Sequence, residues 1–244
     1  MFHKEEVLIP FNTSPLPEGP WMVFAPHADD ETFGMGGTLL KSKAQGIETH
    51  LVVLTDGAEG GDADNLVDIR RKEVQRAAEI LGFQSLQCWS EPDRFLDAHN
   101  YLVEKVVSLI TEIKPKSVFF PGPLEIHPDH RAAGLLAWRA IQRISKAYKP
   151  EPIAYEIGVQ NPINCLIDIS SQIETKKEVM ALFDSQNQEN NYPELVLALD
   201  KGRTFSLPKD IKYAEGFYRY CAEDIELSFE GVTHKIIDLY QRFR

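Results

Sequence analysis

Short apolar runs alternate along the chain with longer segments of helical spacing, and most of the runs end in polar or glycine-rich loops. Runs of this length, dense in β-branched and aliphatic residues, are typical of buried strands, whereas apolar positions three and four residues apart indicate helices that bury one face. Their alternation is typical of βαβ units, in which parallel strands are joined by crossover helices. It predicts strands at residues 21–25, 50–54, 85–89, 117–120, 153–159 and 165–169.

Helical spacing fills most of the segments between these strands. The clearest case is an apolar stripe from Val74 to Leu81, which Gly82 follows as a helix-ending residue. Similar spacing predicts helices at residues 36–44, 102–113, 128–147 and 173–183. From Gln186 onward the pattern is mixed and predicts no particular element. We expect one α/β domain over residues 1–244, a Rossmann-like three-layer sandwich with a mostly parallel sheet.

Composition narrows the class of protein. With 244 residues and 43% hydrophobic content, the chain is long enough to bury one substantial core. The net charge of -11 argues against sequence-independent binding to nucleic acid, which requires a basic surface. The three cysteines form no Cys-x-x-Cys pair, so neither a disulfide framework nor a cysteine zinc site is indicated. Without a signal-peptide run or a membrane span, we expect a cytoplasmic protein with a small-molecule ligand.

The first unusual loop directly follows the strand expected at residues 21–25. It contains His27, Asp29, Asp30 and Glu31, and its adjacent acids repel one another unless a cation or a proton compensates. A divalent metal would supply that compensation, and His27 and Asp30 offer one nitrogen and one oxygen that suit Zn²⁺. Two adjacent carboxylates project in different directions, so that one can join the metal while the other acts on a water.

The second loop follows the strand expected at residues 117–120 and contains Glu125, His127, Pro128, Asp129 and His130. Proline suits the first turn of a helix and an acid suits its positive end, so this segment is predicted to start a helix. The two histidines, three residues apart in that turn, can face the same side. Ligands in parallel sheets bind beyond the carboxyl ends of the strands, where both loops are expected. A catalytic zinc takes three protein ligands, and the two loops supply more candidates than that.

The His-x-Asp-Asp-Glu loop, together with the later His-Pro-Asp-His turn, resembles the LmbE-like, or PIG-L, family of zinc N-deacetylases. The two motifs are specific in combination, and weaker matches extend the resemblance over nearly the whole chain. One departure is that the family usually has proline where this chain has Ala28, and alanine where it has Pro26. The weaker matches are Thr55, Asp56, Gly57, Arg70, Glu73, Ala77, Leu81, Gly82, Tyr155, Glu156, Asp168, Ile169, Ser185, Gln186 and residues 213–217.

The resemblance implies a hydrolase that removes the acetyl group from an N-acetylglucosamine-type sugar. On that basis His27, Asp30 and His130 would bind Zn²⁺, and Asp29 would be the general base. An acetamido sugar would then be the substrate, with no nucleic acid and no membrane as partner. The sequence identifies neither the group attached to the sugar nor the oligomeric state, and a homo-oligomer stays open.

The remaining roles follow from the same resemblance. His127 would be the acid or the oxyanion stabiliser, oriented by Asp129, although Asp129 is also an ordinary acid for the start of a helix. Arg70 would reach the substrate, whereas its charged sequence neighbours are also consistent with a solvated helix face. Asp93 follows the third strand, where it is either a plain turn residue or a contact for a sugar hydroxyl. His50 and His99 have no partner in the sequence, and both are interpreted as structural.

Two alternatives come from other classes of protein. Gly34, Gly36 and Gly37 after the first strand, with Asp56 ending the second, partly match a dinucleotide-binding fingerprint. Leu39 occupies the sixth position of that glycine pattern, however, and the acids of the first loop have the wrong charge for a pyrophosphate. A sugar-binding protein without catalysis is the other alternative, and the presence of both complete metal motifs argues against it.

Overall fold

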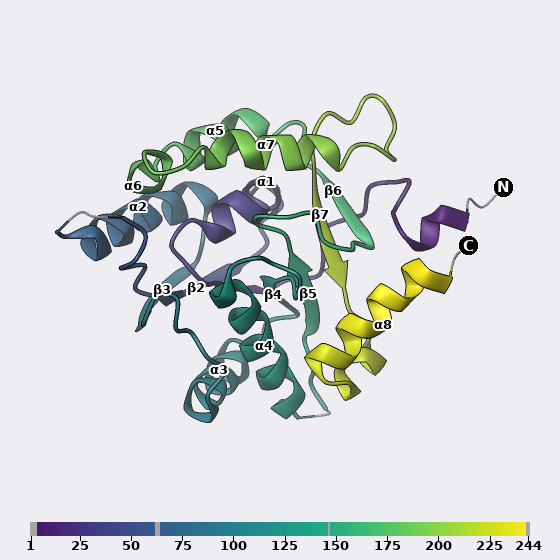
Figure 1. The fold of residues 1–244 in the computed structure, drawn as a ribbon, viewed down its shortest axis with the longest axis horizontal. Coiled ribbons are helices and arrows are strands. Elements are labelled where there is room, and N and C mark those ends of the chain that lie inside the picture. The colour runs from purple at the N-terminus through teal and green to yellow at the C-terminus, as the bar shows by residue number, and fades with distance from the viewer. Residues whose placement is uncertain (1–3, 62–63, 146, 243–244) are drawn as a thin grey trace.

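Seven strands form one central sheet in the computed structural model, which describes residues 4–61, 64–145 and 147–242 (Figure 1). The strands are β1 (Trp21–Ala25), β2 (Thr49–Thr55), β3 (Ser85–Glu91), β4 (Ser117–Pro121), β5 (Glu151–Tyr155), β6 (Cys165–Asp168) and β7 (Ala214–Arg219). Their order across the sheet is β3-β2-β1-β4-β5-β7-β6. Strands β1 to β5 pair in parallel, whereas β7 is antiparallel to both β5 and β6. The predicted mostly parallel sheet is confirmed.

Helices cover both faces of the sheet and complete the predicted three-layer sandwich (Figure 1). One outer layer contains α1 (Asp30–Ala44), α2 (Leu66–Leu81), α5 (Ile173–Met180), α6 (Asp184–Asn187) and α7 (Tyr192–Gly202). The other contains α3 (Asn100–Ile113), α4 (Pro128–Arg143) and α8 (Phe229–Arg242). There are also two short 3₁₀ helices: η1 (Lys4–Val7) precedes β1, and η2 (Ala222–Glu226) lies between β7 and α8. Among the described residues, no helix is both long and apolar enough to cross a membrane.

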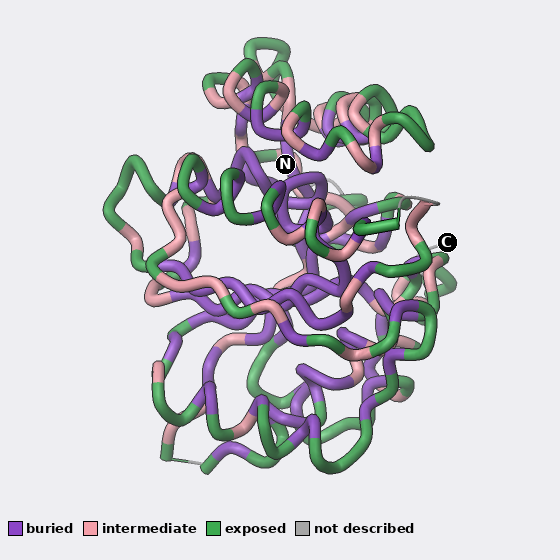
Figure 2. Tube along the Cα trace, turned by 90° about the vertical axis from the view of Figure 1, so that its left-hand side faces the viewer, coloured by how far each residue is buried: buried purple, intermediate pink, exposed green. Residues whose placement is uncertain are grey.

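Strand β1 shows why the core has two halves. All five of its residues are buried, as expected for a parallel strand with helices on both faces. Because alternate side chains point to opposite faces, Met22 and Phe24 join the cluster under α3 and α4, whereas Trp21 and Val23 join the one under α1 and α2. The buried sheet between two more exposed layers is visible in Figure 2.

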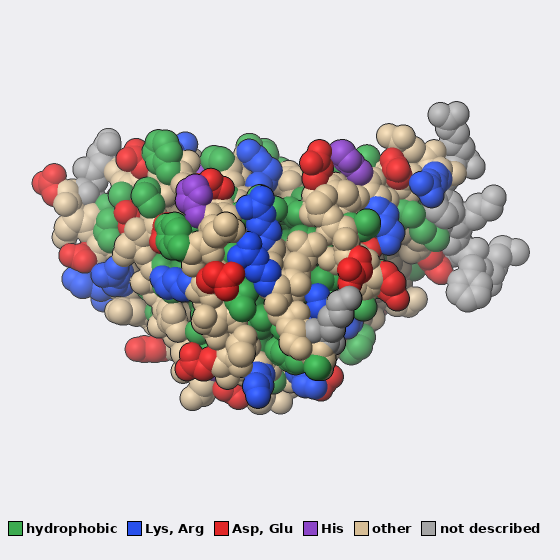
Figure 3. All heavy atoms as spheres, turned by 90° about the horizontal axis from the view of Figure 1, so that it is seen from below, with side chains coloured by type: hydrophobic (Ala, Val, Ile, Leu, Met, Phe, Trp, Pro, Cys, Tyr) green, Lys and Arg blue, Asp and Glu red, His purple; other side chains and the backbone are tan. Residues whose placement is uncertain are grey.

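The outer surface of the second helical layer mixes charges of both signs. On the face seen in Figure 3, basic side chains are bordered by acidic ones. Arg143 on α4, for example, donates to Glu104 on α3 over 2.6 Å.

Several predicted boundaries are wrong for local reasons. The strand expected at 153–159 ends at Tyr155, because Glu156 turns aside to accept hydrogen bonds from Arg203 and from the Asn161 amide. The helix expected at 128–147 ends at Arg143, and within its predicted range Lys146 lies outside the described residues. The helix expected at 173–183 ends at Met180 and is followed by the short α6.

Helix α1 begins six residues earlier than the expected start at Gly36, because Asp30 and Glu31 form its first turn. The helix is kinked at Met35, whose φ of -146° is not helical. Just after the kink, the amides of Gly37 and Thr38 donate to the Glu215 carboxylate of β7 over 2.8 and 2.7 Å. Glu215 thus caps the part of α1 that follows the kink, so the first turn can point in a different direction from the rest of the helix.

The segment after Gln186, for which the sequence predicted no element, supplies α7, β7 and α8. Strand β7 inserts between β5 and β6, so its pairing depends on partners far away in the sequence. The glycines of the dinucleotide alternative lie inside α1, and two of them, Gly34 and Gly37, allow close packing. A Cβ on Gly37 would come within 2.7 Å of Ile169, and one on Gly34 would meet the Glu156 carbonyl.

Candidate active site

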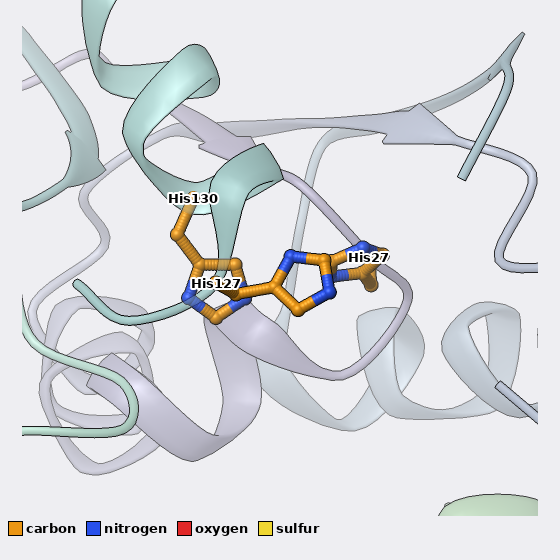
Figure 4. A group of neighbouring side chains, drawn as sticks. All are labelled: His27, His127 and His130. Atoms are coloured by element: carbon orange, nitrogen blue, oxygen red, sulfur yellow. The ribbon is translucent and has the colours of Figure 1, made fainter. Parts of the chain in front are cut away.

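The two loops singled out in the sequence meet at the carboxyl edge of the sheet. Strands β1 and β4 are neighbours, and the sheet continues to β2 on one side and to β5 on the other. This is the point where strand order reverses, at which parallel α/β sheets bind ligands. The β1–α1 loop brings His27 and Asp29 there, and the β4–α4 loop brings His127 and His130. Figure 4 shows the three imidazoles converging from the two loops.

Asp30 lies between two of these imidazoles. Its Oδ2 is 3.0 Å from Nδ1 of His27, and its Oδ1 is 3.3 Å from Nε2 of His130. The backbone amide of His27 also donates to Oδ2 over 2.8 Å, which fixes the carboxylate against the loop. All three residues are buried. One nitrogen from each ring therefore faces the same carboxylate.

The other ring nitrogen of His27 faces two further carboxylates. Its Nε2 is 3.1 Å from Asp93 and 3.2 Å from Asp129. Asp129 also accepts the amides of Arg94 and Leu96 over 2.7 and 3.2 Å, so it fixes the segment after β3. A carboxylate on the second ring nitrogen is the usual orienting partner of a metal-binding histidine. Asp93 and Asp129 together thus set the orientation of the His27 ring.

The charges of this cluster shift the pKa values of its members strongly. Burial lowers the pKa of His27, but the charge of Asp30 and the hydrogen bonds to Asp129, Asp30 and Asp93 outweigh it and raise that pKa well above its usual value. Burial likewise opposes protonation of His130, while the charge of Asp30 raises its pKa to about 9. Burial alone would raise the pKa of Asp30, yet the two imidazoles hold it well below its usual range. The buried carboxylates thus stabilise positive charge on the two imidazoles, and they would stabilise a divalent cation in the same way.

Asp29 sits beside this group in an unusual backbone conformation. Its φ of 148° lies in a region that residues with a side chain rarely adopt, as is common for residues at functional sites. Burial raises the pKa of its carboxyl to about 7, against the lowering charge of Arg70. The Arg70 guanidinium lies 3.4 Å from Asp29 Oδ2 and donates to the Gly57 carbonyl over 3.2 Å. Arg70 is therefore buried against Asp29 and does not lie on a solvated face.

His127 is less buried than its neighbours and caps the start of α4. The backbone amide of Asp129 donates to its Nδ1 over 3.2 Å, whereas the Asp129 carboxylate points to His27. Because Nδ1 accepts this hydrogen bond, Nε2 is the nitrogen that carries the ring proton. Burial and then the charges of His27 and His130 lower the pKa of His127.

Among the described residues, two groups of side chains have ligand atoms close enough together to hold a metal ion. Ligand atoms of His27, His127 and His130 lie within 4.8 Å of one another, and so do those of His27, Asp93, His127 and Asp129. Neither grouping contains Asp30, although Asp30 is in direct contact with two imidazoles. Nδ1 of His127 is already engaged by the backbone amide of Asp129.

Except for the fully buried Asp129, these side chains line a pocket of about 620 Å³. This volume falls within the usual range for small-molecule sites. Part of the wall comes from the segment that the sequence left unassigned: Gln186 belongs to α6, and Tyr192 and Val196 belong to α7. The mouth includes Arg94 and the exposed Ile126.

Both loops lie within the part of the chain that matches a known family. The family described as PIG-L, GlcNAc-PI de-N-acetylase, matches residues 22–141. A diacetylchitobiose deacetylase of Thermococcus kodakarensis is 30% identical over 184 residues, which are 68% of this chain and 69% of the relative. The chain belongs to the PIG-L family.

The similarity to solved structures extends beyond the segment that matches the family. A conserved protein from Thermus thermophilus aligns with a TM-score of 0.73 at 29% identity, over 82% of this chain and 94% of that one. The N,N'-diacetylchitobiose deacetylase of Pyrococcus horikoshii, in complex with an inhibitor, aligns with a TM-score of 0.72 at 25% identity, over 82% and 83%. The resemblance that the two sequence motifs predicted is confirmed.

Sequence reasoning missed two acids of this PIG-L site. Glu125 lies two residues before His127, and its carboxylate is 3.4 Å from Nδ1 of His130. Glu31 is fully buried beside Asp30, and burial raises the pKa of its carboxyl to about 8. An acid just before two histidines was a signal for Glu125, whereas nothing in the sequence separated Glu31 from an ordinary helix acid. His50, interpreted as lacking partners, in fact contacts Ser85 and Glu48.

Proposed function

We propose that this PIG-L protein is a zinc-dependent N-deacetylase, which hydrolyses the acetamido group of an N-acetylglucosamine-type sugar to acetate and a free amine. The observation that carries the proposal is the placement of Asp30 between His27 Nδ1 and His130 Nε2, at 3.0 and 3.3 Å. Ligand atoms at tetrahedral positions around Zn²⁺ are about 3.3 Å apart when their bonds are 2.0–2.1 Å long. The two distances, which run to different oxygens of Asp30, are close to that separation, and the three residues give the usual ligand number of a catalytic zinc site.

A zinc ion held there would supply Lewis-acid chemistry, polarising the acetyl carbonyl and making water acidic near neutral pH. We assign Asp29 as the base that accepts a proton from the attacking water, because its carboxylate lies next to Asp30 in the same pocket. A C–O bond forms at the acetyl carbon while its carbonyl oxygen takes up negative charge, and the C–N bond then breaks. The proton required by the departing amine is assigned to Nε2 of His127 in its cationic form, in which Nδ1 no longer accepts the Asp129 amide. The cation would also stabilise the developing negative charge on oxygen.

Arg70 and Asp93 are proposed as substrate contacts, since both line the pocket. The position of Arg70 beside Asp29 gives it a second role in this proposal: its charge favours the ionised form of the base. The relatives named as diacetylchitobiose deacetylases support an acetamido sugar as the substrate class. A cytoplasmic location remains a prediction from the sequence.

We expect the purified protein to contain about one zinc per chain and to release acetate from N-acetylated glucosamine derivatives. Replacing His130 with alanine should abolish tight zinc binding and acetate release together, because one of three ligands is lost. The matched control is His99→Ala, which removes an exposed imidazole on another loop and should change neither. Elemental analysis and an acetate assay measure both effects. Protein purified without chelators that holds no transition metal, or an active zinc-free His130→Ala variant, would refute the proposal.

A further inference from the structure

The Glu125 carboxylate lies in the β4–α4 loop and accepts hydrogen bonds on both oxygens, and the mechanism above does not use it. It is 2% exposed and accepts on both oxygens. Oε1 receives the Ile157 amide over 3.0 Å and the Asn161 side-chain amide over 3.0 Å. Oε2 receives the Gly158 amide over 3.1 Å and lies 3.4 Å from Nδ1 of His130.

These contacts fix which nitrogen of His130 carries the proton. An ionised carboxylate only accepts hydrogen bonds, and three N–H donors already surround this one. The fourth partner, Nδ1 of His130, must therefore be a donor as well. Once Nδ1 holds the proton of the neutral ring, Nε2 presents its lone pair, and Nε2 is the atom that faces Asp30 over 3.3 Å.

The same carboxylate also holds a wall of the pocket. Ile157 and Gly158 line the pocket and belong to the loop after β5, and both of their amides donate to Glu125. Behind them, Arg203 donates to Glu156 and to the carbonyl of Asn161 over 2.6 Å, which secures Asn161 in turn. The loop after β5 and the His130 imidazole thus share the Glu125 carboxylate as a hydrogen-bond acceptor.

We propose that Glu125 is a positioning residue that holds His130 as the Nδ1–H tautomer and thereby aims its Nε2 at the metal, while anchoring the 157–158 wall to the same point. Its effect is exerted through His130, because both of its carboxylate oxygens are already engaged by protein groups. The inference rests on the proposed zinc site. Carboxylates that orient metal-binding histidines change metal affinity by roughly 10- to 100-fold when they are lost.

The test variant is Glu125→Gln, which keeps the shape of the side chain but replaces one acceptor oxygen with an NH₂ donor. Where that donor meets His130, it favours the Nε2–H tautomer, which cannot bind a metal. The Kd for zinc, measured by competition with a chelating dye, should rise roughly 10- to 100-fold. The control Asn161→Ala removes another hydrogen bond of the same carboxylate without touching His130, and its Kd should stay within about twofold of the wild-type value.

Melting temperatures of the zinc-free proteins separate this effect from loss of structure. Both variants loosen the loop after β5 and should melt lower, but only Glu125→Gln should bind zinc more weakly. Equal zinc affinity in Glu125→Gln and the wild-type chain would overturn the inference while leaving the proposed function intact. A wild-type chain that binds no zinc would overturn both.

A second measurement needs no variant. In the zinc-loaded wild-type protein, long-range ¹H–¹⁵N correlation spectra report which ring nitrogen of His130 carries a proton. We expect the proton on Nδ1, protected from exchange by Glu125. A proton on Nε2 would overturn the inference, because that nitrogen would then be unable to face the metal as a ligand.

Discussion

Replacing Asp29 with asparagine should lower kcat by roughly 10²- to 10⁴-fold while zinc content stays at the wild-type level. Asparagine keeps the shape of the side chain but cannot accept a proton from water. The zinc ligands are unchanged, because Asp29 contacts Arg70, whereas Asp30 contacts the two imidazoles. Acetate release and elemental analysis, made on the same preparation, measure the two quantities.

Asp68→Asn is the matched control for that experiment, since it removes an exposed carboxylate from the first turn of α2 and should leave kcat unchanged. Loss of zinc in Asp29→Asn, in parallel with activity, would make Asp29 a ligand. The roles of Asp29 and Asp30 would then be exchanged. Nearly full activity with zinc bound would remove Asp29 from the mechanism.

His127→Ala should retain zinc yet lose roughly 10²- to 10³-fold in kcat. KM should change much less, because the negative charge and the amine that His127 serves arise mainly in the transition state. A zinc-free His127→Ala variant would instead favour the grouping of three imidazoles around the metal. His130→Ala, which removes a proposed ligand from the same helical turn, provides the comparison.

The pH dependence of the His127 variant gives a separate readout. In the wild-type enzyme, Asp29 must be ionised and His127 protonated, so activity should pass through a maximum with pH and decline on the alkaline side because His127 loses its proton. Burial lowers the pKa of His127, so its proton is lost at a lower pH than in an exposed histidine. His127→Ala should therefore lack the alkaline decline in kcat. An unchanged decline would assign it to another group.

Patterns that depend on neighbours in sequence predicted the framework well. The strand at Trp21–Ala25 and the helix start at Pro128 are where the apolar run and the Pro-Asp pair indicated. The kink of α1 was not predicted, because it depends on the distant Glu215 carboxylate, which caps the helix beyond Met35. Strand β7 was missed for a related reason: its pairing partners are remote in the sequence and its own pattern is mixed.

The same limit applies to the site. The two motifs identified the loops that meet, since strand-end loops of a parallel sheet share one edge. They could not indicate that Asp93 and the carboxylate of Asp129 both contact His27, because those contacts depend on the path of the loop after β3. Spacing alone also left Glu125 unassigned, although it lies within the second loop.

Because Glu215 of β7 caps α1, the amino-terminal half of the chain depends structurally on the carboxyl-terminal half. Residues 22–141, the part that matches the family, contain every proposed ligand and the proposed base. Cut after Ile141, however, the chain would leave the edge of β4 without β5 and the amides of Gly37 and Thr38 without their acceptor. The amino-terminal half carries the proposed site residues, and contacts from the carboxyl-terminal half support their positions. We therefore expect that the amino-terminal half alone does not keep the geometry of the site.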